Sequence, residues 1–344
     1  MLPGQQDAFP LFLIFLSSLA FVFLLLPPFM KYLVRRNRVV DDVHKQGGVK
    51  VPSPAGPLLV LALVIGEGFS YAFYPSVLPL VIVAVVLIAS AVGLADDIFV
   101  LGGRIKPLLL LLSAIPLVAA GAAIQGVFDP RLYFPLFTLS GAHFTIYSIL
   151  VLAALPIVSN AFNMVDSFNG EVSGFTILVS LALILGMILR ASDQSDYSVG
   201  RLSLALPLAG ASLGFYFYNR YPSRVFDGDS GSLALGAMYA ALAVIGGVEL
   251  AAVVAIIPAI LNSFYILSSV RGLVERRMMG ARPTKMGEDG LLYARREPTA
   301  PTTLVRMILL DGPLSEKGVV HIILILTAYA CFLSAVTSAL TWLL

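Results

Sequence analysis

The sequence predicts an all-α polytopic membrane protein of about ten transmembrane helices, formed by a single integral-membrane domain over residues 1–344. Hydrophobic residues make up 58% of the chain and charged residues only 12%, whereas a soluble domain carries about 25% charged residues. The mean hydropathy is +0.92. Each span needs about 20 apolar residues, and no long polar segment is left over to build a separate soluble domain.

Apolar runs of suitable length recur along the whole chain. We expect spans at 9–29, 56–74, 76–95, 107–125, 145–163, 172–190, 199–218, 231–247, 250–270 and 319–341. Prolines at positions 116, 156, 207 and 258 fall inside four of these runs and are expected to kink their helices.

The basic residues predict the orientation of the chain. With these spans, 19 of the 22 Lys and Arg residues fall on one face, and only Arg131, Arg190 and Arg201 fall on the other. The positive-inside rule makes the first face cytoplasmic and places both termini outside. The polar loops, and with them any active site, are then cytoplasmic.

Other classes of protein fit the composition less well. The single cysteine, Cys331, excludes a disulfide framework and a thiolate metal site. The net charge is only +2, and the basic loops follow from topology, so we expect membrane lipid and no nucleic acid as a partner. A homodimer is compatible with the sequence but not predicted by it.

The segment 159–174, SNAFNMVDSFNGEVSG, places amides and acids between two apolar runs. On a helix, Asn160, Asn163 and Asp166 are spaced i, i+3, i+6 and share one face. Oxygen-bearing groups at the mouth of a membrane helix are costly unless they bind something polar. We interpret this segment as a site for hydrated Mg²⁺ and a nucleotide diphosphate.

Asp96 and Asp97 end the third predicted span. Adjacent carboxylates repel one another, so the pair favours a site where a cation offsets them. Arg104 and Lys106 follow closely and are candidates for that cation. The plainer alternative is a solvated helix end, where acidic residues are common.

The segment from Asp227 to Gly231, DGDSG, precedes the eighth predicted span. Glycine lets the backbone approach a phosphate, and a helix N-terminus offers unpaired N–H groups. A carboxylate such as Asp229 on this turn can bind Mg²⁺, which favours one or two protein oxygens together with waters and phosphates. A simple capped helix start is the alternative.

Two further loops contain candidate substrate contacts. Asp42 and Lys45 lie in a Gly- and Pro-rich loop, where a plain turn is the alternative. Arg282 and Lys285 lie in the longest basic loop and are candidates for diphosphate binding, although topology alone explains most charges there. Glu67 lies well inside the second span and receives no role.

Three motifs occurring together, ADDIFVLGGRIK, NAFNMVDSFNG and VFDGDSGS, resemble those of the polyprenyl-phosphate N-acetylhexosamine-1-phosphate transferases. These ten-span enzymes move a sugar phosphate from a UDP-sugar to a lipid phosphate. The resemblance covers most of the chain and lies closest to the branch that transfers N-acetylglucosamine-1-phosphate (GlcNAc-1-phosphate) to dolichyl or polyprenyl phosphate.

The resemblance implies roles for individual residues. Asn163 and Asp229 match the positions that coordinate Mg²⁺, for which Mn²⁺ is a substitute. Asp96 and Asp97 match paired catalytic acids, and Lys106 matches a lysine that contacts phosphate. The substrate-binding candidates are Asn160, Asp166, Asn169, Phe226, Arg282, Lys285, Asp42 and Lys45, with Asn169 and Phe226 near the uracil.

One departure from the family pattern bears on the donor. Peptidoglycan-type members carry a histidine-rich motif in the last cytoplasmic loop, and residues 271–317 contain no histidine. This favours UDP-GlcNAc as donor and a dolichyl-type acceptor, as in the first membrane step of lipid-linked glycan synthesis. UDP-GalNAc and UDP-MurNAc-pentapeptide stay open as donors.

A transporter of nucleotide sugars or lipid-linked anions is the alternative from another class. Transporters place polar residues near the bilayer midplane, often in two related halves. Here the polar clusters lie at helix ends on one side, and the two halves of the sequence do not match.

Overall fold

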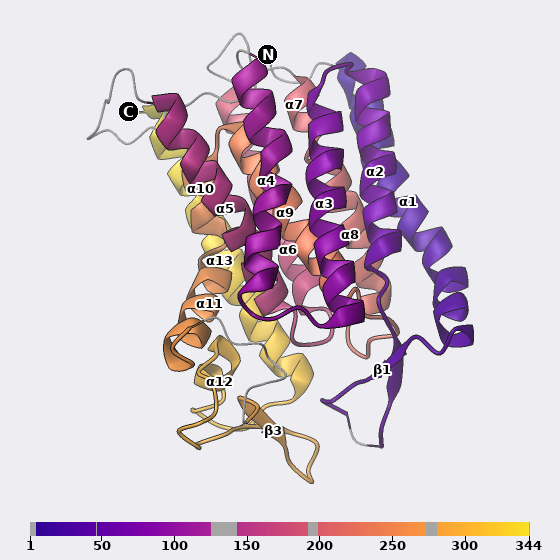
Figure 1. Ribbon diagram of the computed structural model, residues 1–344, viewed down its shortest axis with the longest axis vertical. Coiled ribbons are helices and arrows are strands. Elements are labelled where there is room, and N and C mark those ends of the chain that lie inside the picture. The colour runs from indigo at the N-terminus through magenta and orange to yellow at the C-terminus, as the bar shows by residue number, and fades with distance from the viewer. Residues whose placement is uncertain (1–4, 46, 125–142, 192–198, 273–280, 344) are drawn as a thin grey trace.

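Long apolar helices run side by side in this computed structural model, and both chain ends lie at the same end of the bundle (Figure 1). The structure describes residues 5–45, 47–124, 143–191, 199–272 and 281–343. Its helices are α1 (Gln5–Arg35), α2 (Gly56–Phe73), α3 (Leu78–Phe99), α4 (Ile105–Ala123), α5 (His143–Val165), α6 (Glu171–Ala191), α7 (Val199–Ser203), α8 (Leu206–Asn219), α9 (Asp229–Gly246), α10 (Glu249–Ala255), α11 (Ile257–Ser269), α12 (Leu304–Ile308) and α13 (Glu316–Leu343).

The predicted all-α membrane architecture is confirmed, and two of the predicted spans are broken. Among the described residues, eight helices are long and apolar enough to cross a membrane. The predicted seventh span is divided into α7 and α8, and the ninth into α10 and α11, which bend by 66°. Pro207 and Pro258 stand at the starts of α8 and α11, where a missing N–H costs no helical hydrogen bond.

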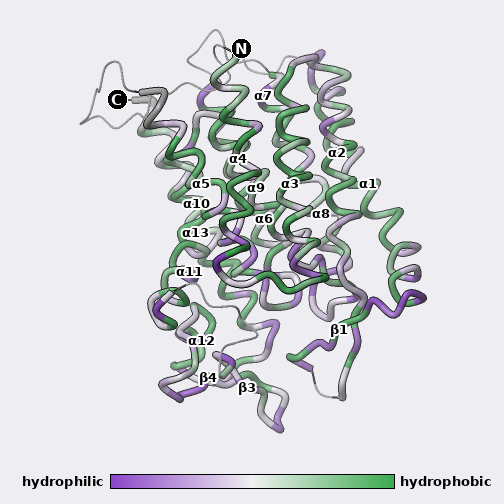
Figure 2. Tube along the Cα trace, viewed as in Figure 1, coloured by the Kyte–Doolittle hydropathy of each residue, from purple (hydrophilic) through white to green (hydrophobic). Residues whose placement is uncertain are grey.

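Two short hairpins project at the end opposite the termini (Figure 1). Antiparallel strands β1 (Val39–Asp41) and β2 (Lys50–Pro52) form one of them, and β3 (Thr284–Met286) and β4 (Leu292–Ala294) form the other. Figure 2 shows hydrophobic residues along the helices and hydrophilic segments gathered around the hairpin end. That this end faces the cytoplasm stays a prediction, and Arg131, Arg276 and Arg277 lie outside the described residues.

Helix α9 is the central element of the bundle. Every residue from Ser230 to Gly246 is buried, and α9 packs most extensively against α3 and α5. Its sequence, DSGSLALGAMYAALAVIG, is rich in Gly, Ala and Ser. Small side chains let helix backbones approach closely where lipid provides no hydrophobic driving force.

The C-terminal end of α9 is closed by two arginines from neighbouring segments. A guanidinium N–H of Arg190 donates to the carbonyl of Gly247, and Arg201 Nη1 donates to the carbonyl of Ile245 at 3.0 Å. Helix ends leave unpaired carbonyls with partial negative charge. These two bonds satisfy such groups at the bundle end where the termini lie.

Glycines allow the N-terminal end of α9 to contact α2 and α3 directly. A Cβ atom added at Gly93 of α3 would collide with the backbone of Asp229 and Ser230, and one added at Gly56 of α2 would collide with Gly231 and Ser230. These collisions involve backbone atoms, which cannot move aside like a flexible side chain. The contacts therefore fix the position of Asp229.

We predict that Gly93→Ala destabilises the protein by about 1–3 kcal/mol, the usual cost of overpacking. Gly68→Ala is the matched control, because a Cβ there meets nothing within 4 Å and alanine favours an exposed helix. Thermal unfolding in detergent would compare the two variants with the unaltered protein. Equal unfolding midpoints for all three would contradict the proposed close contact.

Candidate active site

The side chain of Lys106, at the start of α4, joins three of the predicted site residues. Its Nζ lies 3.1 Å from Asp96 Oδ2 and 3.0 Å from Asn163 Oδ1, and it also pairs with Asp229 Oδ2. The Lys106 and Asp96 side chains are nearly buried, whereas that of Asp229 is 29% exposed. A ligand would therefore reach this cluster from the side of Asp229.

Asn163 and Asp229 are direct neighbours, although 66 residues separate them in the chain. Asn163 Nδ2 donates to Asp229 Oδ1 and to Ser232 Oγ, both at 2.9 Å. Asn163 lies on the last turns of α5, and Asp229 is the first residue of α9. The packing of α5 against α9 thus brings two of the predicted motifs together.

The adjacent acids Asp96 and Asp97 point to different partners. Asp97 Oδ1 accepts the N–H of Asp229 at 2.9 Å, and Asp97 Oδ2 accepts the N–H of Ser230 at 3.1 Å. Asp97 therefore caps α9 from a neighbouring helix. The expectation that this helix start offers unpaired N–H groups to a phosphate is wrong, because the carboxylate occupies the first two.

Gly228 is required for this cap. Its φ is +73°, and a Cβ atom there would lie 2.6 Å from Pro54 Cβ and 2.9 Å from Asp97 Oδ2. The backbone beside it pairs with the segment before α2. Phe226 N–H donates to Pro52 O at 3.0 Å, and Phe226 O accepts the N–H of Ala55 at 2.9 Å. These bonds fix the backbone of Phe226, whose side chain is half-buried.

A second cluster forms around Asn169 and joins the first loop to the helices. Lys45 Nζ lies 2.5 Å from Asp42 Oδ2 and 2.7 Å from Asn169 Oδ1, and Asn169 N–H donates to Glu316 Oε1 at 3.0 Å. Burial raises the pKa of Asp42, but the hydrogen bonds from Lys45 and Asn169 outweigh it and lower that pKa overall. Asp42 therefore stays ionised and holds Lys45 in place.

Other predicted residues lie at the end of α5 and on the β3–β4 arm. Asn160 Nδ2 faces the sulfur of Met164 at 3.8 Å. Asp166 follows α5, and its N–H continues the helical pattern to Phe162 O at 3.2 Å. Arg282 and Lys285 lie on the β3–β4 arm, which projects from the bundle (Figure 1). Their contact with a diphosphate stays a prediction.

Several residues of the site escaped sequence reasoning. Ser232 accepts a hydrogen bond from Asn163, and Glu316 and Ser223 are hydrogen-bonded to Asn169.

Asp227 is fully buried, and neither of its side-chain oxygens has a hydrogen-bond partner in the described structure. Burial raises the pKa of Asp227 well above its usual value, and the charge of Asp166 adds to the shift. In the sequence, only the presence of a second aspartate, Asp229, in the DGDSG motif pointed to Asp227 as a residue of the site.

The donor set of the Lys106 cluster fits a hard cation. Carboxylate and amide oxygens from Asp96, Asn163 and Asp229 meet at one ammonium group, and such oxygens are the ligands Mg²⁺ prefers. No group of three or more His, Cys, Asp and Glu side chains in the described residues is arranged as a metal site. A Mg²⁺ that keeps its waters and binds phosphate oxygens needs only one or two protein ligands.

Comparison with known proteins places the chain in a family. The profile described as glycosyl transferase family 4 matches residues 79–247, which include Asp96, Lys106, Asn163 and Asp229. A putative glycosyltransferase of Methanocaldococcus jannaschii is 30% identical over 288 residues, 83% of each chain.

Two other relatives carry more specific names. A UDP-N-acetylglucosamine–dolichyl-phosphate N-acetylglucosaminephosphotransferase of Dictyostelium discoideum is 24% identical, over 85% of this chain and 79% of its own. A phospho-N-acetylmuramoyl-pentapeptide-transferase of Caldicellulosiruptor bescii is 30% identical, over 63% of this chain and 68% of its own. The resemblance drawn from the three motifs is confirmed, and the chain belongs to glycosyl transferase family 4.

Proposed function

We propose that this protein transfers GlcNAc-1-phosphate from UDP-GlcNAc to a dolichyl-type polyprenyl phosphate and releases UMP, with Mg²⁺ as cofactor and the active site on the cytoplasmic face. The observation that carries the proposal is the meeting of Asp96, Asn163 and Asp229 on Lys106 at one end of a membrane bundle. Membership of a family of sugar-phosphate transferases supports an enzyme over a transporter.

The choice of donor rests on two observations. The Dictyostelium relative named for UDP-GlcNAc aligns over 85% of this chain, and the muramoyl-pentapeptide relative over 63%. Residues 271–317 contain no histidine, unlike the peptidoglycan-type pattern. Both favour GlcNAc.

Charge repulsion is the main barrier, since both reactants are anionic phosphates. Catalysis then depends on positioning and on fixed cations. Mg²⁺, held by Asn163 and Asp229, would neutralise diphosphate charge. Lys106 supplies a further positive charge, which Asp96 keeps directed at the cluster.

A strong general base is not needed at the acceptor. The second pKa of a phosphate monoester is about 6, so the lipid phosphate is already mostly dianionic at neutral pH and can attack the β-phosphorus directly. Asp97 is better placed for positioning than for proton transfer, because both of its oxygens accept backbone N–H groups of α9.

Phe226 and Asn169 are the candidates for contact with the nucleotide half of the donor. Phe226 offers a ring for stacking on uracil, and Asn169 offers an amide held by Lys45 and by Ser223 N–H. Arg282 and Lys285, on the basic β3–β4 arm, are further candidates for contact with the diphosphate.

The reaction is tested by UMP release from the purified protein in detergent with Mg²⁺ and a polyprenyl phosphate. UDP-GlcNAc, UDP-GalNAc and UDP-MurNAc-pentapeptide are compared as donors. We expect kcat/KM to be at least about tenfold higher for UDP-GlcNAc, because a pocket that hydrogen-bonds one sugar leaves polar groups unpaired with another. UMP from another donor alone would overturn the sugar assignment, and no UMP from any donor would overturn the reaction.

The metal assignment is tested by Asp229→Asn and Asn163→Ala. We expect each to lower kcat by about 100-fold or more and to abolish the rise in unfolding midpoint that Mg²⁺ gives the unaltered protein. Asp41→Ala, at an exposed position of β1, should keep both properties. If Mg²⁺ stabilises the Asp229→Asn and Asn163→Ala variants as well as the original, the ion binds elsewhere.

The stacking role is tested by Phe226→Ala. Stacking of a base on an aromatic ring contributes about 1–3 kcal/mol, so the KM for the UDP-sugar should rise by about 5-fold to 150-fold. Phe226→Tyr keeps the ring and should restore a KM close to the original. An unchanged KM in the alanine variant would remove Phe226 from the nucleotide site.

A further inference from the structure

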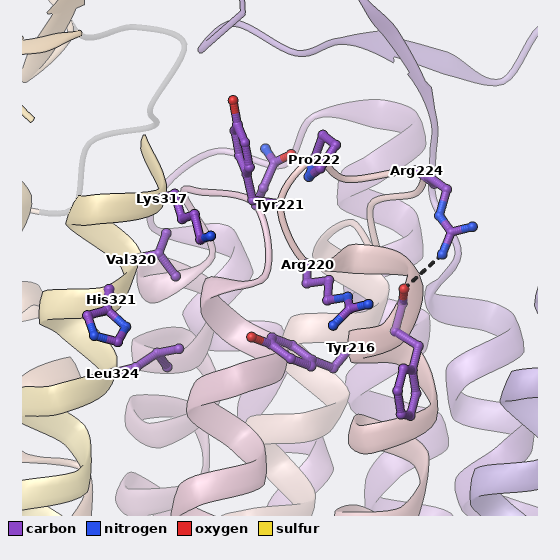
Figure 3. Close-up of a pocket in the computed structure, with 11 residues that line it drawn as sticks. Tyr216, Arg220, Tyr221, Pro222, Arg224, Lys317, Val320, His321 and Leu324 are labelled. Atoms are coloured by element: carbon purple, nitrogen blue, oxygen red, sulfur yellow. Dashed lines mark hydrogen bonds between the residues drawn. The ribbon is translucent and has the colours of Figure 1, made fainter. Parts of the chain in front are cut away.

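A cavity of about 470 Å³ lies between the ends of α8 and α13, apart from the Lys106 cluster. Figure 3 shows Tyr216 reaching from α8 toward α13, where Lys317, His321 and Leu324 form the opposite wall. Its volume is in the usual range for small-ligand sites, about 300–1,000 Å³.

The cavity is strongly basic. Arg220, Arg224, Lys317 and His321 all line it. Arg224 already donates to Phe217 O at 2.9 Å and lies over the Tyr218 ring. The Arg220 guanidinium lies 5.9 Å from the centre of the Phe217 ring. Neither Arg220 nor Lys317 forms a salt bridge with a carboxylate in the described part of the chain, so both can pair with an anion. The only acid next to Lys317 in sequence, Glu316, accepts the N–H of Asn169.

The apolar wall indicates an amphipathic ligand. Val320 and Leu324 lie one and two turns along α13 from Lys317, on the helix that continues as an apolar span of 26 residues. Gly174 of α6 packs against two of the lining residues, since a Cβ atom there would lie 3.1 Å from Leu324 and 3.3 Å from Tyr216. A headgroup beside Arg220 and Lys317 would leave its acyl chains along α13.

We infer that this cavity binds the phosphate headgroup of an anionic membrane phospholipid. Basic pockets between transmembrane helices at the membrane surface are suited to such headgroups. Tyrosine is also enriched at the membrane interface, and Tyr216 and Tyr221 line this cavity. This inference does not depend on the proposed reaction, because it concerns lipid binding at a cavity outside the Lys106 cluster, although Asn169 of the proposed nucleotide site also lines it.

The occupant would also contact the segment that leads to the catalytic cluster. Tyr221 lines the cavity, and the Lys45 ammonium lies 4.8 Å from the centre of its ring. Asn169 lines it too, and its Oδ1 accepts the N–H of Ser223 at 2.6 Å. A bound headgroup would therefore restrain the chain between Arg220 and Asp229.

The test uses the full-length protein in neutral detergent with added phosphatidylglycerol or phosphatidylcholine. We expect phosphatidylglycerol to raise the unfolding midpoint by about 3–5 °C and to remain bound through gel filtration, as measured by native mass spectrometry. The double variant Arg220→Gln/Lys317→Gln should lose most of both effects. Lys50→Gln/Arg296→Gln, which removes the same charge at exposed positions, should keep them.

Three outcomes would overturn the inference. One is equal retention of phosphatidylglycerol by Arg220→Gln/Lys317→Gln and the unaltered protein. Another is an equal shift of the midpoint by phosphatidylcholine. The third is an equal shift by inorganic phosphate or UMP, which would make the cavity a site for soluble anions.

The effect of the bound lipid on the chain between Arg220 and Asp229 is tested separately, and this test rests on the proposed function. Phosphatidylglycerol should raise the rate of UMP release by about twofold or more in the unaltered protein and not in the Arg220→Gln/Lys317→Gln variant. Unchanged rates despite bound lipid would overturn this coupling while leaving the binding site intact.

Discussion

A helix buried along its whole length must find partners for both of its ends, and this constraint on α9 organises the molecule. Unpaired N–H and carbonyl groups at the ends of a largely buried helix are costly. The Asp97 carboxylate accepts the first two N–H groups of α9. Arg190 and Arg201 donate to carbonyl groups at its C-terminal end. The helix is thereby fixed along its axis as well as sideways.

The charge balance of the candidate site follows from this placement. Fixing the start of α9 sets Asp229 against Asn163 of α5 and Lys106 of α4. Two carboxylates and one ammonium then share a small, partly buried volume, which leaves one negative charge that a divalent ion and an anionic substrate can balance. A buried charge without a partner would cost several kcal/mol, so each member of the cluster depends on the others.

Composition and motif spacing were enough to predict the helical membrane fold and most residues of the Lys106 cluster. The length of an apolar run predicts a transmembrane helix, and adjacent acids such as Asp96 and Asp97 predict a nearby cation. The sequence could not tell that these two acids have different partners, because that depends on how α3 meets α9. Kinks at Pro207 and Pro258 were predicted, but the complete breaks in the two helices there were not. The basic cavity was missed as well, because its lining residues come from separate helices.

The arginine bonds at the far end of α9 change how the charge distribution of the chain should be read. Only three of its 22 basic residues fall on that side in the predicted topology. Two of these three, Arg190 and Arg201, are directed at carbonyl oxygens, where the negative end of the helix dipole partly cancels them. These two arginines therefore contribute less positive charge to that side of the bundle than a simple tally of lysines and arginines implies.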